Sequence, residues 1–178
     1  MVGLILEGKV RWGGVSNFGV DLLTRCDSVR HPDALQCPLN LTNQTARDEI
    51  IPWCQSHGTG VIIYAPLASG LLSGAFDRRR IENLPADDGR RRLPRFNEPH
   101  LSRTLVLVDR LKPVARQLGL NLPALAVAWT LTISGVTGAI AGARHPHQVD
   151  GWLPAAEVRL DNETLSAIDR TVQEVNTQ

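Results

Sequence analysis

The sequence predicts an α/β fold in which parallel strands alternate with helices, and two observations lead to that prediction. Short apolar runs of strand type alternate four times with segments whose apolar residues recur at helical spacing. Small or polar residues follow each of these short runs. Alternation of this kind favours parallel strands joined by right-handed crossovers, and 178 residues are enough for one domain with a hydrophobic core.

The first half of the chain carries three of the four expected strands. Pro38 stops the second strand, and Gly58 ends the second long helical segment. The expected elements, in order, are the last turn of a helix at 2–6 with Gly8 as its C-cap, a strand at 10–15, a helix at 20–29, a strand at 34–37, a helix from 43–45 to about 57, and a strand at 61–64.

The second half begins with a long charged stretch and is then mainly helical. Pro123 and Pro146 stand where first-turn prolines belong, and Asp161 or Asn162 is the expected cap of the last helix. The expected elements are a loop at 77–98, an amphipathic helix at 101–118, a buried helix at 125–133, a strand at 136–141, a helix from 146 to about 156, and a closing helix at 162–175.

The composition argues against several classes of function. A net charge of +1 gives no bulk field for nucleic acid or for an anionic membrane. No apolar run approaches the roughly 18 residues that a membrane span needs, and we expect no signal peptide. Cys26, Cys37 and Cys54 lack metal or redox spacing, so we expect packed thiols in a reduced, cytoplasmic protein without a metal site.

The stretch Val61–Gly74, VIIYAPLASGLLSG, is the most informative part of the chain. It predicts a buried strand that runs directly into a loop of small residues, where Ser69 and Gly70 leave backbone amides uncovered. A ligand with a flat apolar part and a charged part would suit this loop. On these residues alone, a tight strand-to-loop connection without a ligand is equally compatible with the pattern.

The loop at 77–98 carries two runs of three arginines and one further arginine, Arg95. A solvated surface loop is the simpler interpretation of these arginines, although a long loop inside a compact domain is often functional or mobile. Acidic residues interrupt the basic runs and no aromatic series accompanies them, so nucleic-acid binding is disfavoured.

Four small or polar clusters stand at the C-terminal ends of the expected strands, at Ser16–Asn17, Gln36, Tyr64–Gly74 and Gly142–Arg144. In parallel α/β units, ligand groups lie at this end of the strands. Because four successive clusters occupy the same face, the sequence predicts a binding site there.

Five segments resemble motifs of the aldo-keto reductases. GKVRWGGVSNF at Gly8–Phe18 is similar to the family pattern GKVRxxGVSNF, and YAPLASGLLSG at Tyr64–Gly74 is similar to Y-S-P-L-x-x-G-L-L-x-G. Gln36–Asn40 resembles the following strand end, and Pro85–Arg90 resembles the P-x-D-D-x-R loop. IAGARHPHQV at Ile140–Val149 resembles I-P-G-A-R-x-P-x-Q-V, and the motifs run in family order over nearly the whole chain.

The resemblance implies the parallel (β/α)8 TIM-barrel fold, with residues 1–178 forming one partial domain of about half a barrel. It also implies NADP(H) as cofactor and reduction of aldehydes or ketones to alcohols by hydride transfer. Carried over by position, Ser16, Asn17 and Gln36 would hold the nicotinamide carboxamide, and Tyr64 would stack on the nicotinamide ring. The other implied cofactor residues are Leu67, Ser69, Gly70 and Leu72 along the pyrophosphate and ribose, and Gly142, Ala143, Arg144 and Gln148 at the adenosine 2′-phosphate.

The chain departs from the family pattern at a few positions. Ala75 stands where the family often has Lys, and Trp152 stands where an Asn is common. Trp152 would either stack on adenine or anchor its helix by burial. Ala141 replaces a proline, which we expect to affect only packing.

The family's catalytic Asp, Tyr, Lys and His precede the GVSN strand, and this chain offers no substitute for them. Its only tyrosine is Tyr64, while Lys9 and Lys112 lie ahead of the first strand and inside a helix. We therefore expect no catalytic residue in this chain and no activity of the chain alone. His145 and His147 are expected at a surface helix start rather than in a metal site.

Half a barrel has two unpaired strand edges and an apolar inner face. We expect such a chain to self-associate, to pair with another half-barrel chain, or to be poorly soluble, and to act on a carbonyl substrate only when the missing half is supplied. Truncation, a misplaced start codon and gene splitting all fit this expectation. The alternative is a non-catalytic NADP(H)-binding or regulatory interaction module.

Overall fold

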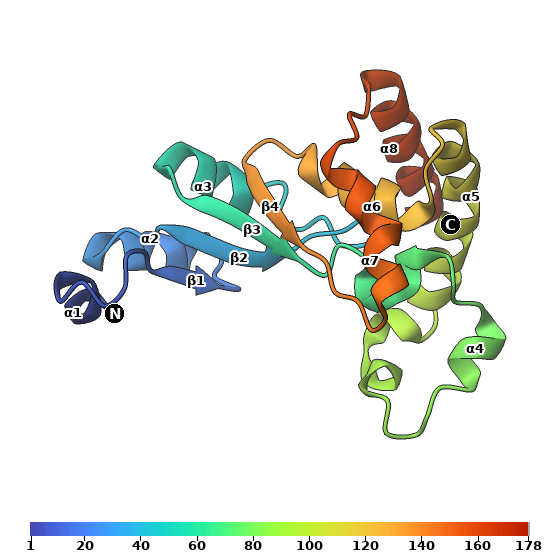
Figure 1. Cartoon of the computed structure of the whole chain (residues 1–178), viewed down its shortest axis with the longest axis horizontal. Helices are drawn as coiled ribbons and strands as arrows, with labels where there is room; N and C mark the ends of the chain where they lie inside the picture. The colour runs from blue at the N-terminus through green and yellow to red at the C-terminus, as the bar shows by residue number, and fades with distance from the viewer. Residues whose placement is uncertain (178) are drawn as a thin grey trace.

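The computed structural model describes residues 1–177, and its four strands form one parallel sheet in the order β1-β2-β3-β4 (Figure 1). The strands are β1 (Gly14–Ser16), β2 (Ala34–Pro38), β3 (Gly60–Tyr64) and β4 (Val136–Ile140). Strands that follow one another in sequence are neighbours in the sheet. This is the arrangement of successive units in a (β/α)8 barrel, of which the sheet is a half.

Helices connect and cover the strands, and several begin or end at the residues that the sequence indicates. Oδ1 of Asn121 accepts a 2.9 Å hydrogen bond from the amide of Ala124, and Gly58 ends its helix at φ +72°. The helices are α1 (Val2–Leu6), α2 (Val20–Val29), α3 (Ile50–His57), α4 (Arg78–Glu82), α5 (His100–Gln117), α6 (Leu122–Leu131), α7 (Pro146–Trp152) and α8 (Asn162–Asn176), with 3-10 turns η1 (Ala68–Ser73), η2 (Gly89–Arg92), η3 (Pro94–Phe96) and η4 (Leu153–Ala156).

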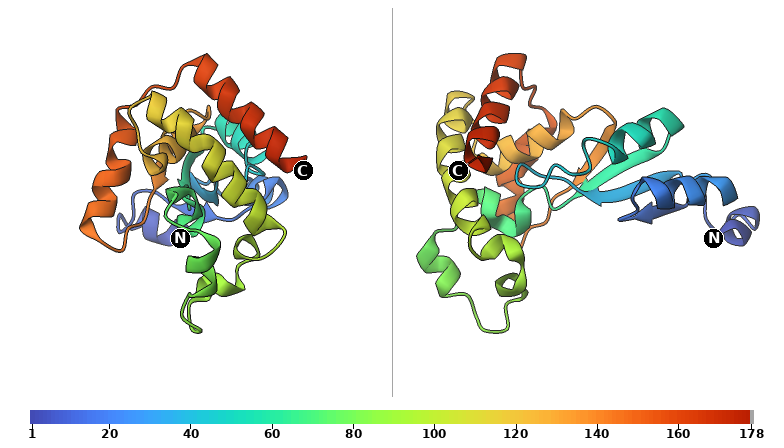
Figure 2. Two further views of the ribbon diagram at one scale, coloured as in Figure 1. Left: turned by 90° about the vertical axis from the view of Figure 1, so that its right-hand side faces the viewer. Right: turned by 180° about the vertical axis from the view of Figure 1, so that it is seen from behind.

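The sheet buries one of its two faces. Leu35 and Ile63 are fully buried in the main core, whereas Ile62 and Ile140 keep 37% and 47% of their surface exposed. Successive side chains of a strand point to opposite faces, so this alternation separates a covered face from a bare one. Figure 2 shows α5, α6 and α8 gathered at one end of the molecule and β1 with α1 at the other.

The first strand is shorter than the sequence predicts, because residues 10–13 do not join the ladder. The amide of Gly13 donates instead to Oδ2 of Asp33 at 2.7 Å. A Cβ on Gly14 would stand 2.7 Å from the carbonyl oxygen of Ala34, so the small residue lets β1 approach β2 closely. Gly14 is thus required by the close packing of β1 against β2.

The helix expected from 43–45 begins later, at Ile50. Oδ1 of Asn43 accepts hydrogen bonds from the amide and the hydroxyl of Thr45, at 3.3 and 2.9 Å, and this local turn replaces the first helical turn. The 77–98 segment is also more ordered than a plain loop. It contains α4, whose N-cap Asp77 accepts from the amide of Arg80 at 2.7 Å, and two 3-10 turns.

Candidate cofactor site

Four of the residues implied to bind the nicotinamide lie at the ends of β1, β2 and β3. Ser16 pairs with Gln36 in the parallel ladder, and its hydroxyl donates to the Gln36 carbonyl at 3.1 Å. The amide of Asn17 donates to the same carbonyl at 2.9 Å. The hydroxyl of Tyr64 donates to Oδ1 of Asn17 at 3.0 Å, so the side chains of Ser16, Asn17 and Tyr64 gather around the Gln36 backbone in one cluster.

The backbone around this cluster is held in an unusual conformation. Asn17, Ala65, Ala68 and Ser69 all have φ between +48° and +60°, the left-handed region that residues other than glycine rarely adopt. Fully buried Asn40 supports the turn after β3, because its Nδ2 donates to the carbonyl of Ala65 at 3.0 Å. Strain of this kind is typical of ligand-binding loops whose shape is fixed by their surroundings.

A cleft of about 790 Å³ continues from the end of β3 to the loop after β4. Ala65 lines it and follows Tyr64 directly in sequence, which joins the cleft to the cluster. Leu72 does not line it, since its side chain is fully buried in the core. The implied cofactor residues that do line the cleft are Leu67, Ser69, Gly70, Gly142, Ala143, Arg144 and Gln148.

The loop after β4 is arranged by Gln148. Oε1 of this side chain accepts from the amides of Arg144 and His145, at 2.7 and 3.3 Å, and so ties the loop to the start of α7. At Gly142 a Cβ would meet no atom within 4 Å, so the glycine leaves open space on the cleft wall. The loop therefore presents the Arg144 side chain beside an open stretch of backbone.

Two arginines of the 77–98 segment also line the cleft, which corrects the interpretation of that segment as a purely solvated loop. Their guanidinium carbons lie over the ring of Phe76, at 4.5 Å for Arg80 and 5.2 Å for Arg90. Nη1 of Arg80 donates to the carbonyl of Ala75 at 2.8 Å. The similarity of Pro85–Arg90 to the family loop was a sequence signal for the placement of Arg90, whereas no sequence signal pointed to Arg80.

Asp88 fixes the second of these arginines. Its carboxylate accepts from Nε and Nη2 of Arg90, at 2.9 and 2.5 Å, and from the Arg90 amide at 2.9 Å. The hydrogen bonds from Arg90, with a smaller contribution from the charge of Arg144, hold the pKa of Asp88 well below its usual range. The segment is thus anchored by an ion pair that faces the loop after β4.

Three further cleft residues come from the segment around α7. The rings of His145 and His147 stack with centroids 5.6 Å apart, and both line the cleft instead of standing only on an outer helix surface. Trp152 lines the cleft and packs against a small apolar cluster that includes Val127 and Ala155, so it is anchored by burial, while its stacking on adenine stays a prediction. No helix in residues 1–177 has the length and hydropathy to cross a bilayer.

A model of the aldo/keto reductase family matches residues 1–173. The chain belongs to the aldo/keto reductase family. It is 27% identical to probable aldo-keto reductase 1 of Glycine max over 169 residues, which are 95% of this chain and 48% of that protein. It also superposes on the glycerol dehydrogenase of Gluconobacter oxydans with a TM-score of 0.89 and 32% identity, over 99% of this chain and 53% of that one.

This aldo/keto reductase chain spans about half the length of the relatives it matches.

Its two lysines lie away from the strand ends. Nζ of Lys9 pairs with Glu7 at 2.6 Å ahead of β1, and Nζ of Lys112 pairs with Asp109 at 2.8 Å on α5. Residues 1–177 also contain no group of three or more His, Cys, Asp or Glu side chains arranged to hold a metal ion.

Proposed function

We propose that this chain binds NADP(H) in the cleft and at the adjoining strand ends, and that it contributes this half-site to the reduction of aldehydes or ketones. The observation that carries the proposal is the composition of the cleft wall, where Arg80, Arg90 and Arg144 face the space beside Gly142. The nearby cluster of Asn17, Gln36 and Tyr64 adds amide groups and one aromatic ring.

These groups match the parts of the cofactor in chemical type. A guanidinium group can bind a phosphate through two parallel hydrogen bonds, so Arg144 is assigned to the 2′-phosphate and favours NADP over NAD. Carboxamides of Asn17 and Gln36 offer both a donor and an acceptor to a ligand amide. The volume of about 790 Å³ lies in the range of small-molecule sites. When bound, NADPH supplies the hydride for carbonyl reduction.

A second half-barrel is proposed to complete the site. Strands β1 and β4 each have only one neighbour among the described residues, and the face of the sheet that carries Ile62 and Ile140 is bare. Another half-barrel, from a second copy of this chain or from a different chain, would pair with these edges and cover this face. Only a different half-barrel would also supply the family's proton donor.

A non-catalytic NADP(H)-binding or regulatory module is the second candidate. This candidate is favoured by the positions of the tyrosine and the two lysines, the residue types that could take part in proton donation. The one tyrosine, Tyr64, gives its hydroxyl hydrogen to Asn17, and both lysines are paired with carboxylates away from the site. The two candidates make the same binding prediction and differ in the turnover of an assembled complex.

Binding is tested by titrating the chain with NADPH and with NADH while following the fluorescence of the reduced cofactor. We expect NADPH to bind more tightly, and Arg144→Gln to weaken it by about tenfold while changing NADH little. Arg116→Gln, a charge-matched change on the exposed surface of α5, should leave both affinities unchanged. Equal effects of Arg144→Gln on the two cofactors would contradict the assignment of Arg144.

Assembly is tested by sedimentation velocity over a range of chain concentrations. We expect association of the purified chain, and we expect Ile62→Glu to shift it toward monomer because a charge would then be buried in the interface. Val106→Glu, at an equally exposed apolar position on α5, is the control. A compact monomer at all concentrations would exclude the self-association.

A further inference from the structure

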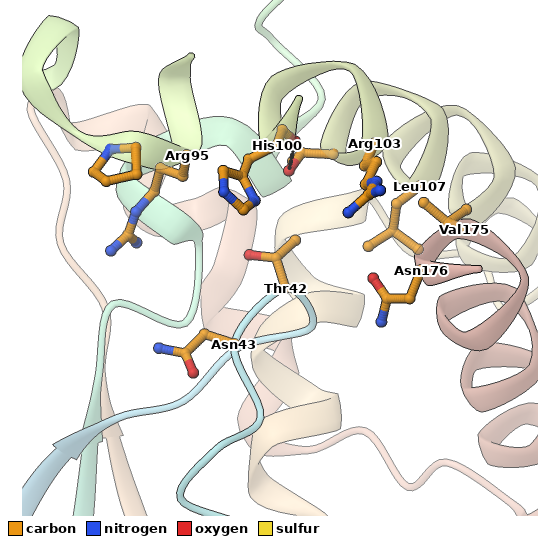
Figure 3. A pocket seen from close by; sticks show the side chains of 10 residues that line it. Thr42, Asn43, Arg95, His100, Arg103, Leu107, Val175 and Asn176 are labelled. Atoms are coloured by element: carbon orange, nitrogen blue, oxygen red, sulfur yellow. Dashed lines mark hydrogen bonds between the residues drawn. The ribbon is translucent and has the colours of Figure 1, made fainter. Parts of the chain in front are cut away.

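A second pocket lies apart from the cofactor cleft and shares no lining residue with it. It has a volume of about 260 Å³ and opens between η3, the first half of α5, the end of α8 and the loop after β2 (Figure 3). We propose that this pocket binds a small dianion of the phosphomonoester class. The proposal is independent of NADP(H) binding.

The charge of the pocket wall is the first reason. Arg95 from η3 and His100 and Arg103 from α5 line the pocket, and none of its lining residues is acidic. Figure 3 shows Arg95 toward one end of the pocket and Arg103 toward the other, with His100 between them and Thr42 and Asn43 on the facing side. Two guanidinium groups flanking one small space suit a ligand with several equivalent anionic oxygens.

The hydrogen-bonding capacity of these cations is the second reason. Within residues 1–177, neither guanidinium group takes part in an ion pair or hydrogen bond. Two carboxylates close in sequence to the lining residues are committed elsewhere, since Glu98 binds Arg78 at 2.6 Å and Glu174 binds Arg110 at 2.8 Å. The pocket therefore gathers positive charge without an internal counter-charge in the described chain.

Asn43 adds a neutral donor on the opposite wall. Its Oδ1 already accepts from the amide and hydroxyl of Thr45, at 3.3 and 2.9 Å. This fixes the carboxamide and leaves its Nδ2 group to donate, and in Figure 3 that nitrogen turns toward the side of the pocket where Arg95 lies. An anion between the two walls would thus meet charged donors and an oriented amide.

The floor of the pocket limits the size and character of the ligand. Buried Leu107 and Val175 line it, so part of the pocket is apolar. A volume of about 260 Å³ is below the usual range for large cofactors and suits a phosphate group on a short carbon chain. These features favour a small phosphorylated metabolite over a nucleotide.

The test is a chemical-shift titration of the ¹⁵N-labelled chain with inorganic phosphate and with glycerol 3-phosphate, using glycerol as the uncharged control. We expect saturable shifts of the amides at 42–43, 95–98, 100–107 and 175–176, with Kd at or below about 1 mM, and no shifts with glycerol. The position of the shifted amides separates this pocket from the cofactor cleft. Phosphate that bound in the cleft would shift the amides of Gly142 and His145, and Arg144→Gln should remove those shifts and leave the shifts of the second pocket unchanged.

The double variant Arg95→Gln/Arg103→Gln should weaken the pocket response by at least about tenfold. Arg170→Gln, on the exposed face of α8, removes one charge nearby and should leave it unchanged. The unshifted remainder of each variant's spectrum shows that it is folded. The proposal is overturned if phosphate produces no saturable shift at the pocket, or if Arg170→Gln weakens the response as much as the double variant.

Discussion

The hydroxyl of Tyr64 donates a 3.0 Å hydrogen bond to Oδ1 of Asn17, across the intervening strand β2. The residue assigned to the nicotinamide ring thereby orients the residue assigned to the carboxamide. Because Asn17 has φ +60°, its backbone is held in a rarely populated conformation at the same point. The strand-end cluster is thus preorganised by its own members.

Tyr64→Phe removes the hydroxyl and its hydrogen bond to Asn17 but keeps the aromatic ring. We expect NADPH affinity to fall by about fivefold, since a neutral hydrogen bond contributes on the order of 1 kcal/mol. Tyr64→Ala also removes the aromatic face and should weaken binding by more than about tenfold. Fluorescence titration measures both, and unchanged affinity of the phenylalanine variant would show that the Asn17 contact does not matter for binding.

Gly142→Val tests the open wall of the cleft. A side chain at this position meets no protein atom within 4 Å of its Cβ, so we expect unchanged thermal unfolding but a loss of NADPH binding. Gly138→Val provides the matched control, because its Cβ is equally free of neighbours but Gly138 does not line the cleft. Equal affinities for the two variants would place the cofactor elsewhere.

Asp33 makes the stability of the first strand dependent on pH. Hydrogen bonds from the Gly13 amide and the Arg30 guanidinium lower the pKa of its carboxyl. A carboxyl with a lowered folded-state pKa contributes stability above the unfolded pKa of about 3.9, and this contribution disappears as the pH falls through the folded-state value.

In urea unfolding from pH 7 to pH 3, Asp33→Asn should therefore have a lower free energy of unfolding than the parent chain at neutral pH. This difference in free energy should become smaller as the pH falls. Asp87→Asn, an exposed loop position, should track the parent chain throughout. A gap between Asp33→Asn and the parent chain that stays constant across this range would exclude the titration of Asp33 as its source.

The three free thiols should differ in reactivity. Burial raises the pKa of Cys37 and of Cys54 to about 11, whereas Cys26 is partly exposed. A colorimetric thiol reagent should react with one thiol in the native chain and with three in urea. Cys26→Ser should abolish the native reaction, and rapid reaction of a second thiol would mean that the core opens readily.

Much of the fold was predictable from local sequence signals. Gly58 and Asp161 mark helix ends through backbone conformation and capping, which depend on neighbouring residues alone, and both predictions are confirmed. The extent of the first strand was not predictable. It depends on whether the Gly13 amide donates its hydrogen bond to a neighbouring strand or to the carboxylate of Asp33, which is distant in sequence. Tertiary contacts determine which of the two acceptors it reaches.

The site was predictable to a different degree. Arg144 and Gln148, which the resemblance implied, lie on one cleft, and their role at the 2′-phosphate stays a prediction, whereas the side chain of Leu72, also implied, is buried in the core. Arg80 and Arg90 were missed because a charged loop has the same composition whether it is solvated or folded over a cleft. Only the position of Phe76, on which both guanidinium groups lie, distinguishes the two.

The central claim is that this chain holds the cofactor-binding groups of an aldo/keto reductase and not its proton donor. The most direct measurement pairs an NADPH fluorescence titration with an assay of NADPH oxidation in the presence of a small aldehyde, on the same preparation of the purified chain. Saturable NADPH binding without aldehyde-dependent oxidation is the predicted result. Steady aldehyde-dependent NADPH oxidation by the chain alone would contradict it.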